Sequence, residues 1–510
     1  MLVRVPLGLA ACVALGYAHS SSATSEADSN SVQNANHIFN AITSAMRQFG
    51  SSLQHNGMSL FVASVPQGTL FYHGTHSAAS VHGTEWLAFE PEHALLFGRR
   101  RVGPLPPPRP PNGREDNTKV RQSVFHDSPR VPPGRGDKGY LHTYKTLHDL
   151  RLLYIDGMAA AKSDIGTMDS QIYLLTNITD GPMMGELERA KDMCHQSQTL
   201  WNGRIDGFIR METGFEIILC HFEDHLQLVR LLDVSLPVVE EKDIPQLWFS
   251  YFQAVTSRNW GIGGSRVSLN FEDFVTAFTF DDDLFFNSTW QNLPRLNSAS
   301  NATISSIRQE IDRIALSARS PSPDMVQWQE VADMVVSRYA ARIAYLRSGA
   351  FPTTSGLRME ARNILAPFYD QQSSDWEEQV IACSDELIPS TEVATKSLAE
   401  RAIRTVTKRI CNTLYQIANS VDESTNPSVL IEKLVEYLNW PVWKNCRGCQ
   451  ADEVCLVPMW PFGTVDDWKS PNCANTTGIA SKERIGGYWG PPLGRRDSGI
   501  EVPRRHPLSL

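Results

Sequence analysis

The sequence predicts an α+β fold in three parts: a mixed N-terminal domain, a helical domain and a disulfide-stapled C-terminal lobe. Short strand-like runs recur between residues 59 and 235, with helix-like stretches among them. Beyond about residue 245 the apolar residues follow helical spacing instead. Four cysteines then gather between residues 446 and 473. The 510 residues are 42% hydrophobic and 20% charged, which provides enough apolar material for two or three such units.

Apolar spacing gives the expected elements in order. Strands are predicted at 59–65, 69–72, 85–89, 150–155, 207–211, 215–222 and 226–229. Helices are predicted near 38–49, from Glu90-Pro91-Glu92, and at 156–163, 184–201, 304–318, 324–347, 390–420 and 428–439. In the helix at 324–347 one stripe of residues is expected to be buried. That stripe is Trp328, Val331, Val335, Tyr339 and Ile343.

These patterns divide the chain into six parts. They are a signal peptide (1–18), a mature N-terminal segment with one helix (19–58), the mixed domain (59–235), the helical domain (245–440), a Cys/Trp-rich lobe (441–478) and a disordered tail (479–510). Residues 98–139 interrupt the mixed domain with nine prolines and almost no apolar periodicity. Such a segment cannot bury enough surface to offset the entropy of ordering, so we expect a disordered insertion. Arg99-Arg100-Arg101 is a potential processing site there, and strand-like patterning resumes at Leu141.

The charge balance argues against nucleic-acid binding. The chain has 47 basic and 56 acidic residues, a formal net charge of −9. Eight Arg and two Lys against four acids give residues 98–139 a charge of +6, which leaves about −15 for the remainder. A basic face over the whole fold is therefore not expected, and we predict no nucleic-acid partner.

The first eighteen residues have the pattern of a secretory signal. Arg4 supplies the positive charge, residues 5–14 are apolar, and Gly16 and Ala18 are the small residues of a cleavage site. The alternative is an apolar first helix of the fold. No later stretch approaches the roughly 20 apolar residues that cross a bilayer. We expect a secreted protein with no stable membrane insertion.

Glycosylation motifs agree with that compartment. Four N-x-S/T sequons predict exposed, glycosylated asparagines. They begin at Asn177, Asn287, Asn301 and Asn475.

Cysteine usage also indicates an oxidising compartment, because an even number in a secreted chain predicts disulfides. The eight outside the signal are Cys194, Cys220, Cys383, Cys411, Cys446, Cys449, Cys455 and Cys473. We expect the last four to close on themselves in two bridges, which leaves Cys194 with Cys220 and Cys383 with Cys411 as the simplest pairs. Zinc ligation by the closely spaced four is the alternative. Disulfides are favoured, and no metal is expected.

The most informative motif is an apolar strand that ends in His73, Gly74 and Thr75. About ten residues later, residues 85–94 run from a strand into a helix. Far downstream, Glu216 interrupts an otherwise apolar strand. This series over residues 59–230 resembles the ADP-ribosyltransferase fold, in the branch whose first core strand ends in His-Gly-Thr/Ser.

The resemblance implies a role for each of these residues in binding NAD. His73 would hydrogen-bond a ribose hydroxyl, and the backbone at Gly74, beside Thr75, would hold the nicotinamide amide. Trp86 stands where the family has a stacking tyrosine, and it lacks the hydroxyl group. Glu216 would be the catalytic carboxylate that stabilises the developing oxocarbenium ion. The implied reaction cleaves the nicotinamide–ribose bond of NAD, with transfer to an acceptor or to water.

A second hypothesis is a non-catalytic secreted glycoprotein that uses the same fold, or another α+β fold, to contact a protein or glycan partner. His73 would then cap a turn. Glu216 would lie on the solvent face of a strand, where Arg204 or Arg210 could pair with it.

The wider chain also resembles an uncharacterised family of secreted filamentous-fungal proteins. The segments that carry this resemblance are 86–95, 150–162, 204–220 and 453–463. It supplies no activity and bears only on compartment and architecture.

Overall fold

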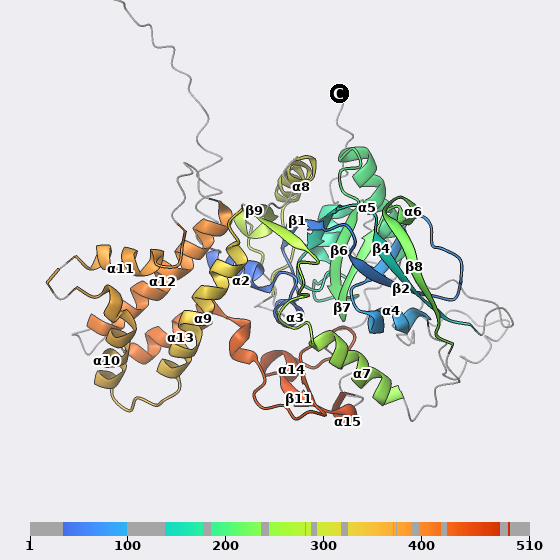
Figure 1. Cartoon of the computed structure of the whole chain (residues 1–510). Coiled ribbons are helices and arrows are strands. Elements are labelled where there is room, and N and C mark those ends of the chain that lie inside the picture. Colours follow the sequence, from blue (N-terminus) through green and yellow to red (C-terminus); the bar gives the residue numbers. More distant parts are fainter. Residues whose placement is uncertain are drawn as a thin grey trace, which may run out of the picture.

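A nine-stranded sheet organises the N-terminal half of the chain. The computed structural model describes residues 34–98, 138–176, 185–235, 244–280, 282–286, 293–317, 325–370, 372–373, 375–389, 397–419, 426–479 and 488–489. The strand order is β8-β4-β2-β3-β7-β6-β5-β1-β9, and the sheet is curled (Figure 1). Neighbouring strands are antiparallel except for β5 and β6, which are parallel. The strands are β1 (Ser59–Val65), β2 (Leu70–Thr75), β3 (Glu85–Ala88), β4 (Tyr140–Thr146), β5 (Leu150–Ile155), β6 (Gly207–Glu212), β7 (Gly214–Leu219), β8 (Leu226–Asp233) and β9 (Ser268–Thr276).

Helices lie around the sheet and make up most of the chain after it. Those near the sheet are α2 (Ala35–Ser44), α3 (Gln48–Leu53), α4 (Pro91–Gly98), α5 (Glu186–Leu200), α6 (Phe222–His225), α7 (Ile244–Thr256) and α8 (Asn301–Leu316), with a π-helical turn at Gln171–Leu175. The helical region contains α9 (Trp328–Arg347), α10 (Thr354–Leu365), α11 (Trp376–Asp385), α12 (Leu398–Asn419) and α13 (Pro427–Leu438). The C-terminal lobe contains β10 (Val454–Leu456), α14 (Val465–Lys469), β11 (Asn472–Ala474) and α15 (Thr476–Ile479). A mixed α and β architecture with a helical region is therefore confirmed.

The seven predicted strands are present, and so is the buried stripe of α9. The helix predicted at 156–163 is wrong. The chain turns directly after β5, with Gly157 at φ +66°. A Cβ atom on Gly157 would lie 2.4 Å from the Gly57 nitrogen, so the two backbones pack too closely for a helix to start there.

The ninth strand lies within the range that was expected to be helical. β9 pairs with β1 at the sheet edge, and the register between them shifts between Phe61 and Ala63. Such a bulge breaks the strict alternation of inward and outward residues along a strand. The sequence of β9 shows neither a strict period of two nor the continuous apolar run that marks β1.

Helix α2 joins the N-terminal segment to the helical region. Asn36 Nδ2 donates to the Tyr437 carbonyl at 2.8 Å, and Asn40 Nδ2 donates to the Leu438 carbonyl at 2.9 Å. The apolar side of α2 is buried as well, with Ile38, Phe39 and Ile42 fully enclosed. Figure 1 shows α2 among helices that come from the far end of the sequence.

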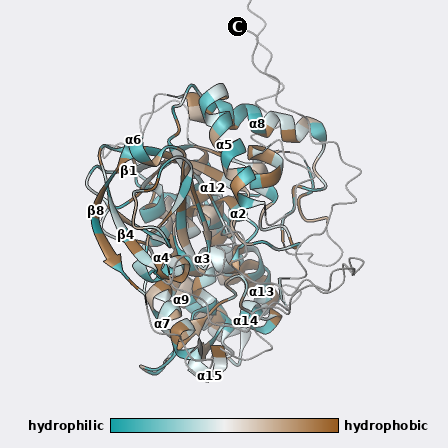
Figure 2. Cartoon of the chain, turned by 90° about the vertical axis from the view of Figure 1, so that its right-hand side faces the viewer, coloured by the Kyte–Doolittle hydropathy of each residue, from teal (hydrophilic) through white to brown (hydrophobic). Residues whose placement is uncertain are grey.

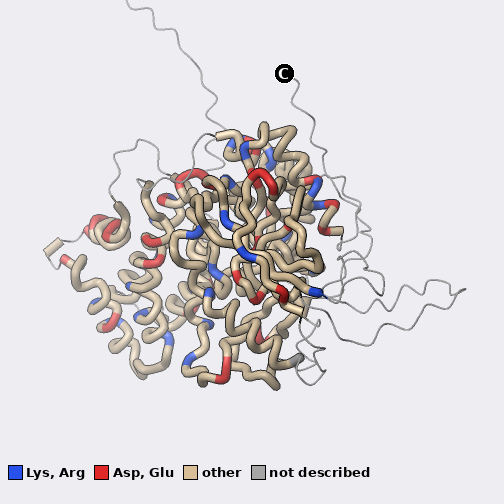
Figure 3. Tube along the Cα trace, turned by 45° about the vertical axis from the view of Figure 1, so that its right-hand side comes forward, with Lys and Arg blue, Asp and Glu red and all other residues tan. Residues whose placement is uncertain are grey.

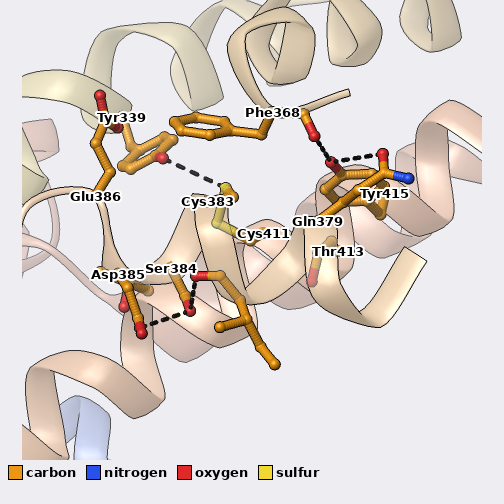
Figure 4. Close-up of a disulfide and its surroundings, with 12 residues drawn as sticks. Tyr339, Phe368, Gln379, Cys383, Ser384, Asp385, Glu386, Cys411, Thr413 and Tyr415 are labelled. Carbon is orange, nitrogen blue, oxygen red and sulfur yellow. Dashed lines mark hydrogen bonds between the residues drawn. A yellow bond between two sulfur atoms is a disulfide. The ribbon is translucent and has the colours of Figure 1, made fainter. Parts of the chain in front are cut away.

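Four disulfides confirm the cysteine pairing. Cys194–Cys220 ties α5 to the end of β7, and Cys383–Cys411 joins α11 to α12. In the second of these, the Tyr339 hydroxyl lies 3.7 Å from Cys383 Sγ (Figure 4). The closely spaced four pair as Cys446–Cys455 and Cys449–Cys473, which staple the lobe around β10 and β11.

Several expectations fall on residues outside the described ranges: the signal peptide, residues 99–137 of the insertion, Asn177, Asn287 and most of the tail. Asn301 and Asn475 are exposed. Basic and acidic positions alternate over the trace (Figure 3). Apolar segments reach the surface at edge strand β8, where Val229 and Leu231 are exposed (Figure 2). Within the described ranges, the helices are too short or too polar to cross a membrane.

Candidate functional site

His73 and Glu216 lie on opposite faces of the sheet. Tyr72 is paired with Ala88, and Ala88 is paired with Glu216. Opposed residues of antiparallel strands point to the same face, and successive residues alternate. Tyr72 therefore shares a face with Glu216, and His73 points to the other side. The structure does not bring these two predicted residues into one cleft.

His73 connects two strands. Its Nδ1–H donates to the Trp86 carbonyl at 2.8 Å, which fixes the neutral tautomer because a carbonyl can only accept. Burial lowers the pKa of His73. Its ring packs against Phe222 and the facing His142. The imidazole thus connects β2 to β3, whose regular backbone pairing is limited to Tyr72 with Ala88.

Gly74 allows α4 to approach the sheet. A Cβ atom at this position would lie only 1.8 Å from the Ala94 carbonyl oxygen. The helix therefore occupies the space above Gly74. Thr75 ends the strand, and its hydroxyl accepts from the Ser77 amide at 3.3 Å. Trp86 is half-buried and paired with Ile218 of β7, which places it on the same face as Glu216.

Glu216 is neutralised by a buried arginine. Arg210 Nε donates to Glu216 Oε1 at 2.7 Å, and the two side chains are 1% and 7% exposed. The Arg210 pairing that the sequence left open is confirmed. The solvent-exposed position expected with it is wrong, because α4 and α5 cover this face of the sheet.

The Arg210–Glu216 pair belongs to a larger buried group, which we call the charge cluster. Its members are Lys162, Glu186, Arg210, Glu212 and Glu216. Lys162 Nζ lies 2.8 Å from Glu212 and 3.0 Å from Glu186, and Arg210 Nη2 lies 3.0 Å from Glu186. Burying charges is unfavourable unless they are paired, and here each charge has a partner of opposite sign. The cluster contains three carboxylates and two cations.

The surroundings of the charge cluster shift the pKa values of Glu212 and Glu186 in opposite directions. Burial, together with the neighbouring carboxylates, raises the pKa of Glu212 to about 7. Burial also acts to raise the pKa of Glu186, but Lys162 and Arg210 outweigh it and lower the value to about 2. Glu212 is therefore easier to protonate than Glu186.

His93 of α4 faces the charge cluster. One atom each of His93, Glu212 and Glu216 lies within 4.8 Å of the others, a separation that a metal ion could span. The His93 Nδ1 atom is buried and has no hydrogen-bond partner in the described structure. Burial lowers the pKa of His93, so its ring is neutral.

A separate cavity of about 520 Å³ lies where α2, α3, the turn after β5, the helical region and the C-terminal lobe meet. Four rings line it, from His37, Phe278, Phe285 and Trp468. Polar lining groups include Asn36, Gln54, Asn56, Asp156, Glu436 and Lys444. We call this space the Lys444 cavity. A volume of this size accommodates a small organic molecule.

Lys444 is the unusual group in that cavity. Its Nζ donates to the Trp468 carbonyl at 3.0 Å and lies 4.9 Å from the centre of the Trp468 ring. Burial lowers the pKa of Lys444. In the described part of the chain it forms no ion pair with a carboxylate. By contrast, an open groove beside β2 contains two arginines that already contact Glu90.

Comparison with known proteins relates the N-terminal part to yeast proteins. Residues 27–105 and 108–247 match the family described as the YPL277C N-terminal domain. This part of the chain is related to an uncharacterised fungal protein family. "Uncharacterized protein YPL277C" of Saccharomyces cerevisiae is 34% identical over 228 residues, 40% of this chain and 44% of the yeast protein. "Uncharacterized protein YOR389W" of the same yeast is 34% identical over 227 residues, 40% of this chain and 34% of the relative.

The chain thus spans less than half the length of either relative. No solved structure matches it. The matched residues include His93 and the whole charge cluster, but they include only part of the Lys444 cavity.

Sequence reasoning missed most of these groups. Arg210 in the apolar strand 207–212 carried a signal, because a charge on a buried strand needs a buried partner. Lys162 was hidden by a misassigned helix. Segments about 400 residues apart in the sequence form the walls of the Lys444 cavity, so no local sequence pattern could have predicted it.

Proposed function

We propose that this chain is a secreted, glycosylated binding protein that takes a small polar ligand with a ring and an acidic group into the Lys444 cavity. One observation carries the proposal: the partly buried Lys444 ammonium group lines the cavity, and among the described residues it forms no ion pair with a carboxylate. A ligand carboxylate or phosphate would supply the missing counter-charge.

The rest of the cavity suits such a ligand. The rings of Phe278 and Trp468 provide apolar walls for a flat group. Asp156 and Glu436 provide acceptors for hydroxyl or amine groups of the ligand. The cavity therefore combines apolar walls with a few polar groups, as small-molecule sites generally do.

This proposal takes the non-catalytic hypothesis in preference to NAD cleavage. The ADP-ribosyltransferase resemblance implies that NAD cleavage needs His73 and Glu216 in one cleft. Glu216 would also need to be unpaired, so that its charge could stabilise a positive transition state. Their opposite faces and the Arg210 ion pair argue against this.

The test uses two pairs of matched ligands on the secreted full chain. Thermal shift and calorimetric titration would compare AMP with adenosine, and indole-3-acetate with indole-3-acetamide. We expect at least one acidic ligand to bind and its neutral counterpart to bind more weakly. Lys444→Gln should remove that difference, whereas Lys408→Gln, on an exposed part of α12, should retain it. Equal binding by wild type and Lys444→Gln would contradict the proposal.

The compartment has its own test. Expression of the full sequence in a fungal host should give a secreted protein that begins after Ala18, with glycan at Asn301 and Asn475. Retention of an unprocessed, unglycosylated chain in the cytosol would contradict secretion without bearing on the cavity.

A further inference from the structure

His93 is a buried histidine that lies beside two carboxylates of the charge cluster. His93 is 2% exposed, and its Nδ1 atom has no hydrogen-bond partner among the residues that the structure describes. An unpartnered polar atom in a protein interior is unfavourable, and native structures rarely retain one. One ring nitrogen of His93 lies within 4.8 Å of a carboxylate oxygen from each of Glu212 and Glu216. These three groups approach one another from α4, β6 and β7.

The backbone preserves room for the imidazole. Gly214 forms the turn between Glu212 and Glu216 and has φ +108°, a conformation that favours glycine. A Cβ atom on Gly214 would lie 3.0 Å from His93 Nδ1. A side chain at this position would therefore press on the atom that lacks a partner.

The neighbouring charges orient the carboxylates. Lys162 contacts Oε2 of Glu212, and Arg210 contacts Oε1 of Glu216. Each carboxylate therefore has a second oxygen outside these ion pairs. Lys162 and Arg210 partly neutralise the carboxylates of Glu212 and Glu216, so they would weaken the binding of a hard cation. An imidazole nitrogen instead favours a first-row transition metal over Mg²⁺ or Ca²⁺.

We propose that His93, Glu212 and Glu216 bind one divalent transition-metal ion, Zn²⁺ or Mn²⁺, in the interior of the N-terminal domain. Two carboxylates and one imidazole form a three-ligand set that leaves a coordination position for water. Local sequence patterns do not indicate this site, because His93 and Glu212 are more than a hundred residues apart and show no metal-motif spacing. The proposal is independent of the Lys444 cavity.

The test is metal analysis of the full chain purified from culture medium. We expect close to one Zn²⁺ or Mn²⁺ per chain in the wild type and loss of that ion in His93→Gln. His142→Gln, which changes another buried histidine of the same sheet, should keep the metal. A wild-type chain that contains no metal, and that takes up neither ion after treatment with a chelator, would overturn the proposal and leave water as the partner of His93. Metal retained by His93→Gln would also overturn it.

A second measurement applies if His93→Gln does not fold. The wild-type chain would be loaded with Co²⁺ and its proton NMR spectrum recorded. One strongly shifted, exchangeable imidazole N–H signal is expected, since ligation through Nδ1 leaves Nε2 protonated. Its absence from the loaded chain would rule out His93 as a ligand. Gly214→Ala should weaken Co²⁺ binding at least tenfold, because the added methyl group displaces Nδ1.

Discussion

Arg210 and Glu216 form an ion pair in which neither side chain reaches solvent, with Arg210 Nε 2.7 Å from Glu216 Oε1. The pair lies across neighbouring strands and is held from a third side by Glu186 of α5. Removing one partner of a buried pair leaves the other uncompensated. The two residues therefore provide a direct measure of how much the charge cluster contributes to stability.

Arg210→Met should destabilise the fold strongly. It leaves Glu186 and Glu216 without their shared cation, so we expect a loss of about 3–5 kcal/mol in the free energy of unfolding. Glu216→Gln should cost less, because the amide can still accept from Arg210. Urea unfolding of both single variants and the double variant gives the coupling energy. A loss below about 1 kcal/mol for Arg210→Met, the range of exposed pairs, would contradict the buried geometry.

Gly74→Ala should displace α4 from the sheet. The new methyl group would lie 1.8 Å from the Ala94 carbonyl oxygen, and a backbone atom cannot move aside as the tip of a side chain can. We expect a loss of several kcal/mol, consistent with severe overpacking. Gly356→Ala in α10 is the matched control. Its methyl group would meet only side-chain atoms, at 3.3 Å or more, and alanine favours the helix by up to about 1 kcal/mol. Equal effects of the two substitutions would refute the close approach at Gly74.

Asp156→Asn should change the pH dependence of stability. Burial raises the pKa of Asp156 to about 7, above its unfolded value. The contribution of Asp156 to the stability of the wild-type protein is therefore present at low pH, and it is lost as the pH rises toward and through 7. Asparagine can still accept the Ser59 amide and does not ionise, so the variant should gain stability relative to wild type from pH 5 to pH 8, by up to about 1.4 kcal/mol per pH unit. Denaturation curves at several pH values test this, and a constant difference between the proteins would show that Asp156 does not titrate there.

NAD should survive incubation with the secreted protein. Since His73 and Glu216 face opposite sides of the sheet, we expect no release of nicotinamide from the wild type, measured beside an active NAD glycohydrolase. Release that Glu216→Gln abolishes would show instead that the chain cleaves NAD by the chemistry that its motifs resemble.

The Cys383–Cys411 bridge should matter more than Cys446–Cys455. The first closes a separation of 28 residues and the second a separation of 9. Chain entropy predicts costs of about 3.6 and 2.6 kcal/mol for removing them. Paired Cys→Ala variants would be compared by thermal unfolding, and a reversed order would indicate that packing, such as that of Tyr339 on Cys383, determines the effect rather than the length of the closed loop.

The sequence predicted features that depend on local pattern and failed where register or distant packing matters. β1 is a nearly continuous buried apolar run and was predicted with its observed ends. Cys194–Cys220, Cys383–Cys411 and the closure of the last four cysteines in two bridges followed from spacing and compartment, whereas the pairing within those four did not. His73, Trp86 and Glu216 were placed on strands, but their faces depend on register, and a shift of one residue reverses a face. The charge cluster and the Lys444 cavity depend on contacts between distant segments.

The docking of α2 has a consequence for biosynthesis. Asn36 and Asn40 donate to the carbonyls of Tyr437 and Leu438, which are translated 401 and 398 residues later. At about 5–20 residues per second, α2 waits roughly 20–80 seconds for these partners to emerge. During this interval its apolar face, with Phe39 and Ile42, has no native cover from α12 or α13. A chain truncated before residue 398 should therefore expose the apolar face of α2, and binding of a chaperone to that truncated chain would detect the exposure.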